Sequence, residues 1–162
     1  MPHSDGAHPY GSDGGDPLTA FHAALGIGVL GSNLIAALWG AVGWLRKDAA
    51  ASIVFWPLLR VAQALVVVQV VVGLLLLARG ASSPDGLHVA YGVAPLLVTL
   101  FSEAARVGVA QKELEDVEDV DALERGEQVA LARRVALGEM GVMTIGALLI
   151  LTLALRAYQT GG

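Results

Sequence analysis

Apolar residues are grouped in four long runs, separated by segments that are rich in glycine, proline or charge. The runs cover about residues 19–45, 53–78, 87–108 and 135–157. Each run reaches the length of about 20 residues with which an α-helix crosses a bilayer. The valine-rich centre of the second run would also suit a buried strand, but lipid leaves the edges of an open sheet unpaired. The pattern therefore predicts an all-α integral membrane protein, a four-transmembrane-helix antiparallel bundle within residues 18–162.

The composition supports this prediction and narrows the chemistry. Hydrophobic residues make up 55% of the 162 residues and charged residues 15%, with a mean hydropathy of +0.63, which is too apolar for a soluble domain of this size. A net charge of -5 gives no basic surface for nucleic acid. The chain has no cysteine, which excludes disulfides, iron–sulfur clusters and zinc thiolate sites. Metal chemistry would have to use histidine, methionine, carboxylates or a cofactor.

The N-terminal segment, residues 1–17, is rich in glycine, proline, serine and aspartate, and we predict a disordered tail on the outer side of the membrane. It lacks the positive charges of a signal peptide, and the apolar run after it is too long for a signal sequence. We therefore expect the first run to be retained as a membrane helix.

Residues 109–134 form an acidic segment between the third and fourth runs, in which Val117, Val120 and Leu123 recur at helical spacing. We expect helical extensions of both flanking membrane helices, joined near Asp121 or Gly126. A solvated helical loop in the cytoplasm is the favoured interpretation, and a docking surface for a partner subunit is the alternative.

The positive charges predict the orientation. Most of them flank the two connections on one side of the membrane: Arg46, Lys47, Arg60, Arg106, Lys112, Arg125, Arg133 and Arg134. Only Arg79 and Arg156 lie at the other ends of the helices. The positive-inside rule then predicts a multi-pass protein of the plasma (inner) membrane with both termini outside.

One familiar motif carries no function here. Residues Gly26, Gly28 and Gly31 match GxGxxG, but a dinucleotide site needs this motif after a strand, and here it lies within a predicted membrane helix. We expect the glycines to serve close helix packing instead.

Two histidines are the strongest candidates for chemistry, because ionisable side chains within membrane helices are costly. His22 and His88 lie near the starts of the first and third helices, which run in the same direction, so both are expected at one depth near the outer surface. Gly26 and Gly92 each follow a histidine by one helical turn, on the same face. The positions without side chains leave room for a flat macrocycle.

This arrangement predicts one haem b whose iron is bound by His22 and His88. Its propionates would emerge at the outer surface, where Arg79 and Arg156 could pair with them. Gln69, on the second helix, would either orient a ligand or bond a neighbouring helix.

The stretch from Gln69 to Gly73 and the four leucines after it, a short connection with a proline, and Leu87–His88 resemble half of the haem A synthase family. The resemblance covers about residues 20–108. It implies a four-helix bundle whose haem iron is bound by histidines near the outer ends of two helices that are separated by one other helix. His22 and His88 match these positions.

The chain also departs from that family. It has one four-helix unit in place of two, one candidate histidine pair, and no acidic residue just before His22. Haem A synthesis is therefore not expected, whereas a haem-holding scaffold is.

Other polar and sulfur-containing residues receive ordinary structural interpretations. Met140 and Met143 lie towards the opposite end from the two histidines and are expected in the core. Glu103 and Glu139 are expected to reach the interface or to pair with Arg106.

Two functions remain open from the sequence. The first is a small b-type cytochrome-like subunit that transfers electrons within a membrane complex, in contact with lipid, other membrane subunits and a redox partner at the outer face. The second is a cofactor-free accessory subunit of a respiratory or transport complex, in which His22 and His88 are half-solvated interfacial residues. Either is more consistent with this chain than a stand-alone enzyme, and neither involves nucleic acid.

Overall fold

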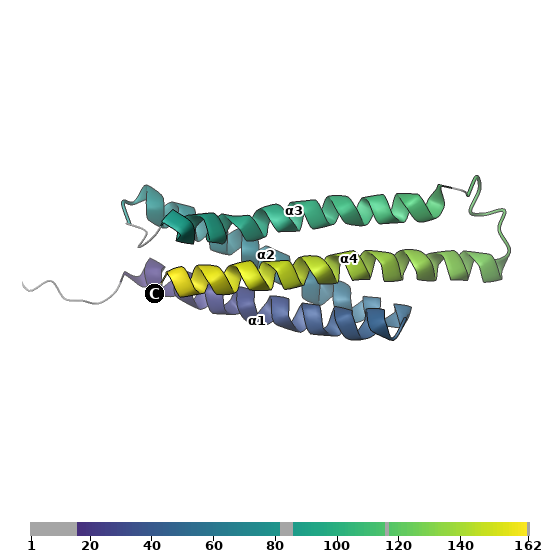
Figure 1. Cartoon of the computed structure of the whole chain (residues 1–162), viewed down its shortest axis with the longest axis horizontal. Coiled ribbons are helices and arrows are strands. Elements are labelled where there is room, and N and C mark those ends of the chain that lie inside the picture. The colour runs from purple at the N-terminus through teal and green to yellow at the C-terminus, as the bar shows by residue number, and fades with distance from the viewer. Residues whose placement is uncertain (1–15, 82–85, 116, 162) are drawn as a thin grey trace, which may run out of the picture.

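The computed structural model describes residues 16–81, 86–115 and 117–161. These residues form four long helices and a short 3-10 helix, and no strand occurs among them: α1 (Pro17–Leu45), η1 (Ala49–Ala51), α2 (Ser52–Ala78), α3 (Gly86–Leu114) and α4 (Arg125–Thr160) (Figure 1). The prediction of an all-α four-helix bundle is confirmed. The predicted disordered tail falls almost entirely on residues outside the described ranges.

All four helices are long and apolar enough to cross a membrane. Large apolar side chains are exposed along each of them, and at most 39% of the most apolar 18-residue window of any helix is buried inside the protein. The fold is therefore compatible with a multi-pass membrane protein.

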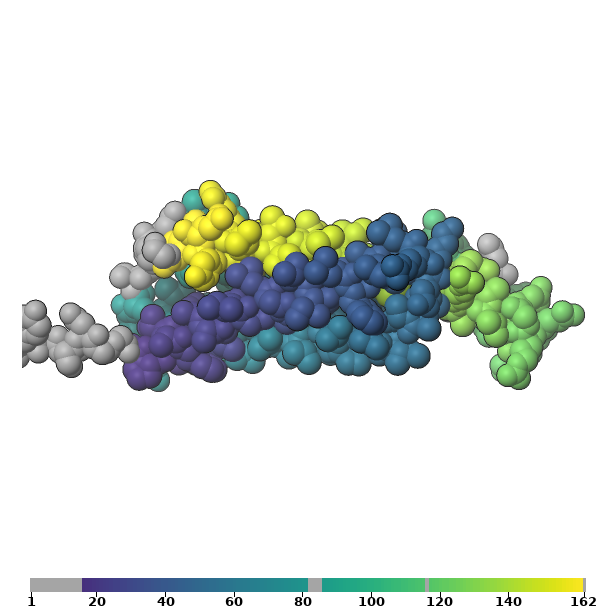
Figure 2. Space-filling view, turned by 90° about the horizontal axis from the view of Figure 1, so that it is seen from below, coloured from purple at the N-terminus to yellow at the C-terminus, as the bar shows by residue number. Residues whose placement is uncertain are grey.

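The helices do not pack equally against one another. α1 contacts both α2 and α4 extensively, and α3 packs mainly on α4, whereas α2 and α3 touch much less. Figure 2 shows α1 lying between α2 and α4 on one face of the molecule. α3 and α4 extend beyond the connection between α1 and α2 (Figure 1). Because α2 and α3 touch so little, the bundle is loosely closed along one side.

The acidic segment continues the helices on both sides, as predicted. α3 extends to Leu114 and α4 begins at Arg125, which leaves a connection over residues 115–124. The predicted junction near Asp121 lies within this connection, although Val117, Val120 and Leu123, which recur at helical spacing, are not helical. The start of α4 is fixed by a capping box, in which the Glu124 side chain accepts a backbone N–H of the first turn and Glu127 accepts the Glu124 N–H.

The core lies along one face of α1 that is formed mainly by small residues. Asn33 and Ala36 are buried there, and the Asn33 amide donates to the carbonyl of Val29 at 2.9 Å. Met140 and Met143 of α4 are 0% and 2% exposed, which confirms their predicted place in the core. Short side chains on α1 thus let the larger residues of α2 and α4 fill the interior.

The glycines that allow close packing are not those of the GxGxxG motif. A Cβ at Gly31 would meet no atom within 4 Å, and one at Gly28 only Leu65, at 3.7 Å. At Gly40, by contrast, a Cβ would lie 2.6 Å from Cε2 of Phe55. The packing role expected for the motif is therefore wrong, because Gly26 lines a cavity between the helices and Gly31 is exposed.

A network of charged side chains links three helices. Arg106 of α3 donates to Glu103 at 3.0 Å and to Glu139 of α4 at 2.9 Å, as predicted. Arg60 of α2 also pairs with Glu103. The guanidinium groups of Arg60 and Arg106 lie 5.5 and 5.2 Å from the ring centre of Trp56. The network therefore joins α2 to α3 where these helices otherwise touch little.

Candidate functional site

The two predicted histidines lie side by side, although their helices do not touch. The ring centres of His22 and His88 are 6.3 Å apart, and the ring planes cross at 70°. His22 lies in the second turn of α1, whose N-terminus is capped by the Asp16 carboxylate, and His88 lies in the first turn of α3. Since α1 and α3 make no helix contact within the described chain, the two side chains meet across a space that α2 and α4 enclose.

This space is a cavity of about 530 Å³ lined by residues of all four helices. Its volume falls in the range of roughly 300–1,000 Å³ that is typical of small-molecule sites. His22, His88, Gly26 and Gly92 all line it, so the structure brings the predicted ligands and glycines together. A Cβ at Gly92 would meet no atom within 4 Å, which shows that this glycine adjoins open space. Apolar side chains and a few polar groups make up the rest of the wall.

α4 holds His88 by a hydrogen bond and by close packing. The ring Nδ1 lies 2.9 Å from the carbonyl oxygen of Ala157, which can only accept, so Nδ1 carries the proton. The lone pair of Nε2 is then available to a metal. A Cβ at Gly161 would lie 2.6 Å from Cε1 of the same ring. Glycine at this position therefore makes room for His88.

α2 holds His22 in a similar way. The side-chain amide Nε2 of Gln69 lies 3.3 Å from Nε2 of His22, and a Cβ at Gly73 would lie 3.0 Å from Cε1 of that ring. Two buried atoms, His22 Nδ1 and Gln69 Oε1, have no hydrogen-bond partner among the described residues. Buried polar atoms without partners are uncommon in folded proteins, and here they adjoin a cavity large enough for a ligand.

The donor set suits a metal that is already held in a macrocycle. No group of three or more histidine, cysteine, aspartate or glutamate side chains with the geometry of a metal site occurs among the described residues. Two imidazoles alone are a poor site for a bare ion, but neutral imidazoles are ligands that could hold haem iron. The ring centres of His22 and His88 are 6.3 Å apart on the wall of one cavity, so a single metal-containing group could contact both rings.

The two predicted arginines lie outside the cavity wall. Arg79 caps the end of α2 and Arg156 lies in the last turns of α4, at the end of the bundle where the histidines lie. Within the described ranges, Arg156 donates to Gln159 at 3.4 Å. Neither arginine lines the cavity, although their neighbours Ala81 and Ala157 do. Their pairing with haem propionates stays a prediction.

Several residues of the site were not predicted from the sequence. Gly73 follows Gln69 by one helical turn and lies on the same helix face. This spacing could have predicted that Gly73 lies beside Gln69 in the site. Ala157 acts through its backbone carbonyl, and Gly161 lies just after the last helix, where no sequence pattern marks a site.

No protein-family model, curated protein or solved structure that was compared with the chain matches it. The candidate site therefore stands on its own geometry. The resemblance of part of the chain to half of a haem A synthase stays a prediction.

Proposed function

We propose that this chain is a small b-type cytochrome of the plasma (inner) membrane, which holds one haem between His22 and His88 and transfers electrons within a membrane complex. The observation that carries the proposal is the pair of imidazoles, 6.3 Å apart, on the wall of a cavity of about 530 Å³.

Insertion into a bilayer is supported by the outward faces of the helices. Side chains such as Ile35, Leu100 and Leu149 are exposed on three different helices, and water would hydrate this surface at a large cost in free energy. The four helices would cross the membrane in alternating directions as an antiparallel bundle. The concentration of Arg and Lys at the end opposite the histidines supports an outer position for the haem and for both termini.

The chain's own residues would prepare the site for the cofactor. The carbonyl of Ala157 fixes the tautomer and orientation of His88 and makes its Nε2 a stronger donor to a metal. Gly73 and Gly161 allow the two rings to approach from opposite sides of the bundle. Tyr91 and Tyr158 contribute aromatic surface to the cavity wall.

Electron transfer fits this arrangement better than catalysis on a bound substrate. A haem supplies reversible one-electron chemistry when it is bound. His22 and His88 would both be used to hold the haem iron, so neither imidazole would be left to act on a substrate. The cavity wall is mainly apolar, and a redox partner would approach from the outer face or through neighbouring membrane subunits.

The test is the visible spectrum of the full chain, produced with an adequate haem supply and purified in mild detergent. The proposal predicts a Soret band that shifts on reduction with dithionite, and a loss of this spectrum in both His22→Ala and His88→Ala. The matched control is the double variant His3→Ala/His8→Ala, which removes two imidazoles outside the described residues and should keep the spectrum. Folded protein without a Soret band would contradict the proposal and favour the cofactor-free accessory subunit.

A further inference from the structure

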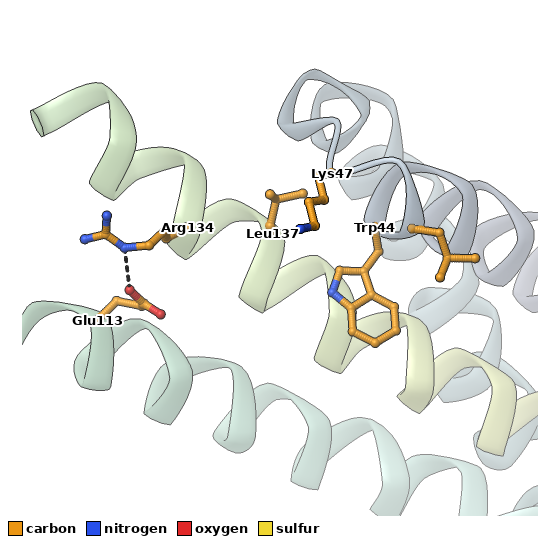
Figure 3. A pocket seen from close by; sticks show the side chains of 6 residues that line it. Trp44, Lys47, Glu113, Arg134 and Leu137 are labelled. Atoms are coloured by element: carbon orange, nitrogen blue, oxygen red, sulfur yellow. Dashed lines mark hydrogen bonds and ion pairs between the residues drawn. The ribbon is translucent and has the colours of Figure 1, made fainter. Parts of the chain in front are cut away.

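A second cavity lies at the end of the bundle opposite the histidines. It has a volume of about 430 Å³ and is formed by the end of α1, the last turns of α3 and the middle of α4 (Figure 3). Its lining residues are Trp44, Leu45, Lys47, Glu113, Arg134 and Leu137. None of these residues lines the histidine cavity.

The cavity wall combines apolar and cationic side chains. Trp44 packs directly on α4, where a Cβ at Gly141 would lie 2.8 Å from the indole Nε1, and Leu45 and Leu137 add aliphatic surface. Lys47 and Arg134 supply positive charge on the same wall. An amphipathic site of this kind matches a molecule with an anionic headgroup and a hydrocarbon chain.

The positive charge at this site is only partly neutralised. Arg134 donates its Nε–H to Glu113 at 2.9 Å, and the two terminal nitrogens of the guanidinium have no hydrogen-bond partner among the described residues (Figure 3). Lys47 has no anionic partner among the described residues, and Arg133 donates to its backbone carbonyl at 2.8 Å. This gathering of cations stands out in a chain whose net charge is -5.

Lys47 adopts a backbone conformation that normally selects glycine. α1 ends in a Schellman motif, in which the Lys47 N–H donates to Trp44 and the Asp48 N–H donates to Gly43. The position after the helix cap has φ 54°, in the left-handed region. α2 ends in the same motif with Gly80 at the equivalent position, at φ 87°. The presence of lysine at a position where glycine is favoured indicates a requirement for its side chain.

We propose that this cavity binds an anionic phospholipid, with the phosphodiester at Lys47 and Arg134 and part of an acyl chain along Trp44 and Leu137. Tryptophan and basic residues at one level of a membrane helix bundle are the side chains that lipid headgroups contact. The inference rests on the membrane insertion in the proposed function but not on the haem.

The experiment compares lipid retention by the full chain in native mass spectrometry, with phosphatidylglycerol and phosphatidylcholine offered in equal amounts. We expect retention of phosphatidylglycerol, and about a fivefold loss of its affinity in either Lys47→Gly or Arg134→Gln, as expected for one cation near a lipid surface. Lys47→Gly relaxes the turn, so its thermal midpoint in phosphatidylcholine should not fall. The matched control is Lys112→Gln, which removes a cation beside Glu113 that does not line the cavity.

Three results would overturn the assignment. Equal retention of both lipids would show that no anionic headgroup is selected, and an equal loss in Lys112→Gln would show a general effect of charge. Stabilisation by inorganic phosphate alone that equals the effect of phosphatidylglycerol would indicate a free-anion site. Flotation of each variant with phosphatidylcholine vesicles tests insertion separately, so failure of the lipid site and failure of membrane insertion are distinguishable.

Discussion

The imidazole of His88 donates its Nδ1–H to the backbone carbonyl of Ala157, 2.9 Å away on α4. That carbonyl lies in the last turn of a helix, where the final carbonyls lack the partners they would have in the helix interior. The Thr160 hydroxyl donates to the same oxygen at 3.1 Å. The end of α4 thus provides an acceptor that fixes one tautomer of His88 and leaves its other ring nitrogen free for a metal.

Gly161→Ala should weaken haem binding by about tenfold or more, because supporting contacts around metal-ligating histidines typically have effects of 10- to 100-fold. The added Cβ would lie 2.6 Å from Cε1 of His88, so the ring must move away from Ala157. Titration of haem into the purified apoprotein measures this change. Gly126→Ala, at the other end of α4, is the control because its Cβ would meet nothing within 4 Å. Equal affinities of the two variants would contradict the role of Gly161.

Gln69→Leu should strengthen haem binding by about fivefold, the effect of one net hydrogen bond. In the structure the Gln69 amide donates to the Nε2 lone pair of His22, and one lone pair cannot also bind a metal. The substitution also removes the buried Gln69 oxygen that has no partner among the described residues. The same titration measures the change. A weaker affinity would show that Gln69 supports the ligand and does not compete with the metal.

Arg106→Gln should lower the free energy of unfolding in detergent by about 1–3 kcal/mol, because it removes the cation that Glu103 and Glu139 share. The arginine side chain is only 25% exposed. Arg134→Gln breaks the pair with Glu113, whose side chains are 57% and 35% exposed, and should cost less than about 1 kcal/mol. Thermal unfolding of both variants in one detergent measures the difference. Similar midpoints would show that the network of charged side chains does not hold the helices together.

Gly40→Ala should destabilise the protein by about 1–3 kcal/mol, because the new methyl group would overlap the buried ring of Phe55. Gly31→Ala, on the same helix, should be neutral or stabilising by up to about 1 kcal/mol, since its Cβ meets nothing within 4 Å and alanine favours a helix. Thermal midpoints in the same detergent test the pair. The reverse order of stability would contradict the packing described for α1.

Much of the fold was predictable from the sequence because lipid imposes a simple rule. Long apolar runs must become helices, and this rule alone predicts four helices close to their observed positions. The helical face of α1 that contains Asn33 was also predictable, since small residues recur there with the period of a helix. The break between Leu114 and Arg125 was not, because Val117, Val120 and Leu123 recur at helical spacing within it and yet form no helix.

Only those parts of the candidate site that are formed by side chains were predictable from the sequence. The rule that alternate helices are parallel placed His22 and His88 at one level, and the structure brings them together. The contributions of Ala157 and Gly161 depend on a backbone carbonyl and on an absent side chain, and neither leaves a pattern in one sequence. Trp44, which lines the second cavity, packs on Gly141, and this packing depends on contacts between helices that are distant in the sequence.

The most direct test of the central claim is the electron paramagnetic resonance spectrum of the oxidised, purified full-length protein. Ligation by His22 and His88 predicts a low-spin ferric haem signal at about one haem per chain, which disappears when either histidine is replaced by alanine. A high-spin signal, or a low-spin signal that survives both substitutions, would contradict haem ligation by this pair of histidines.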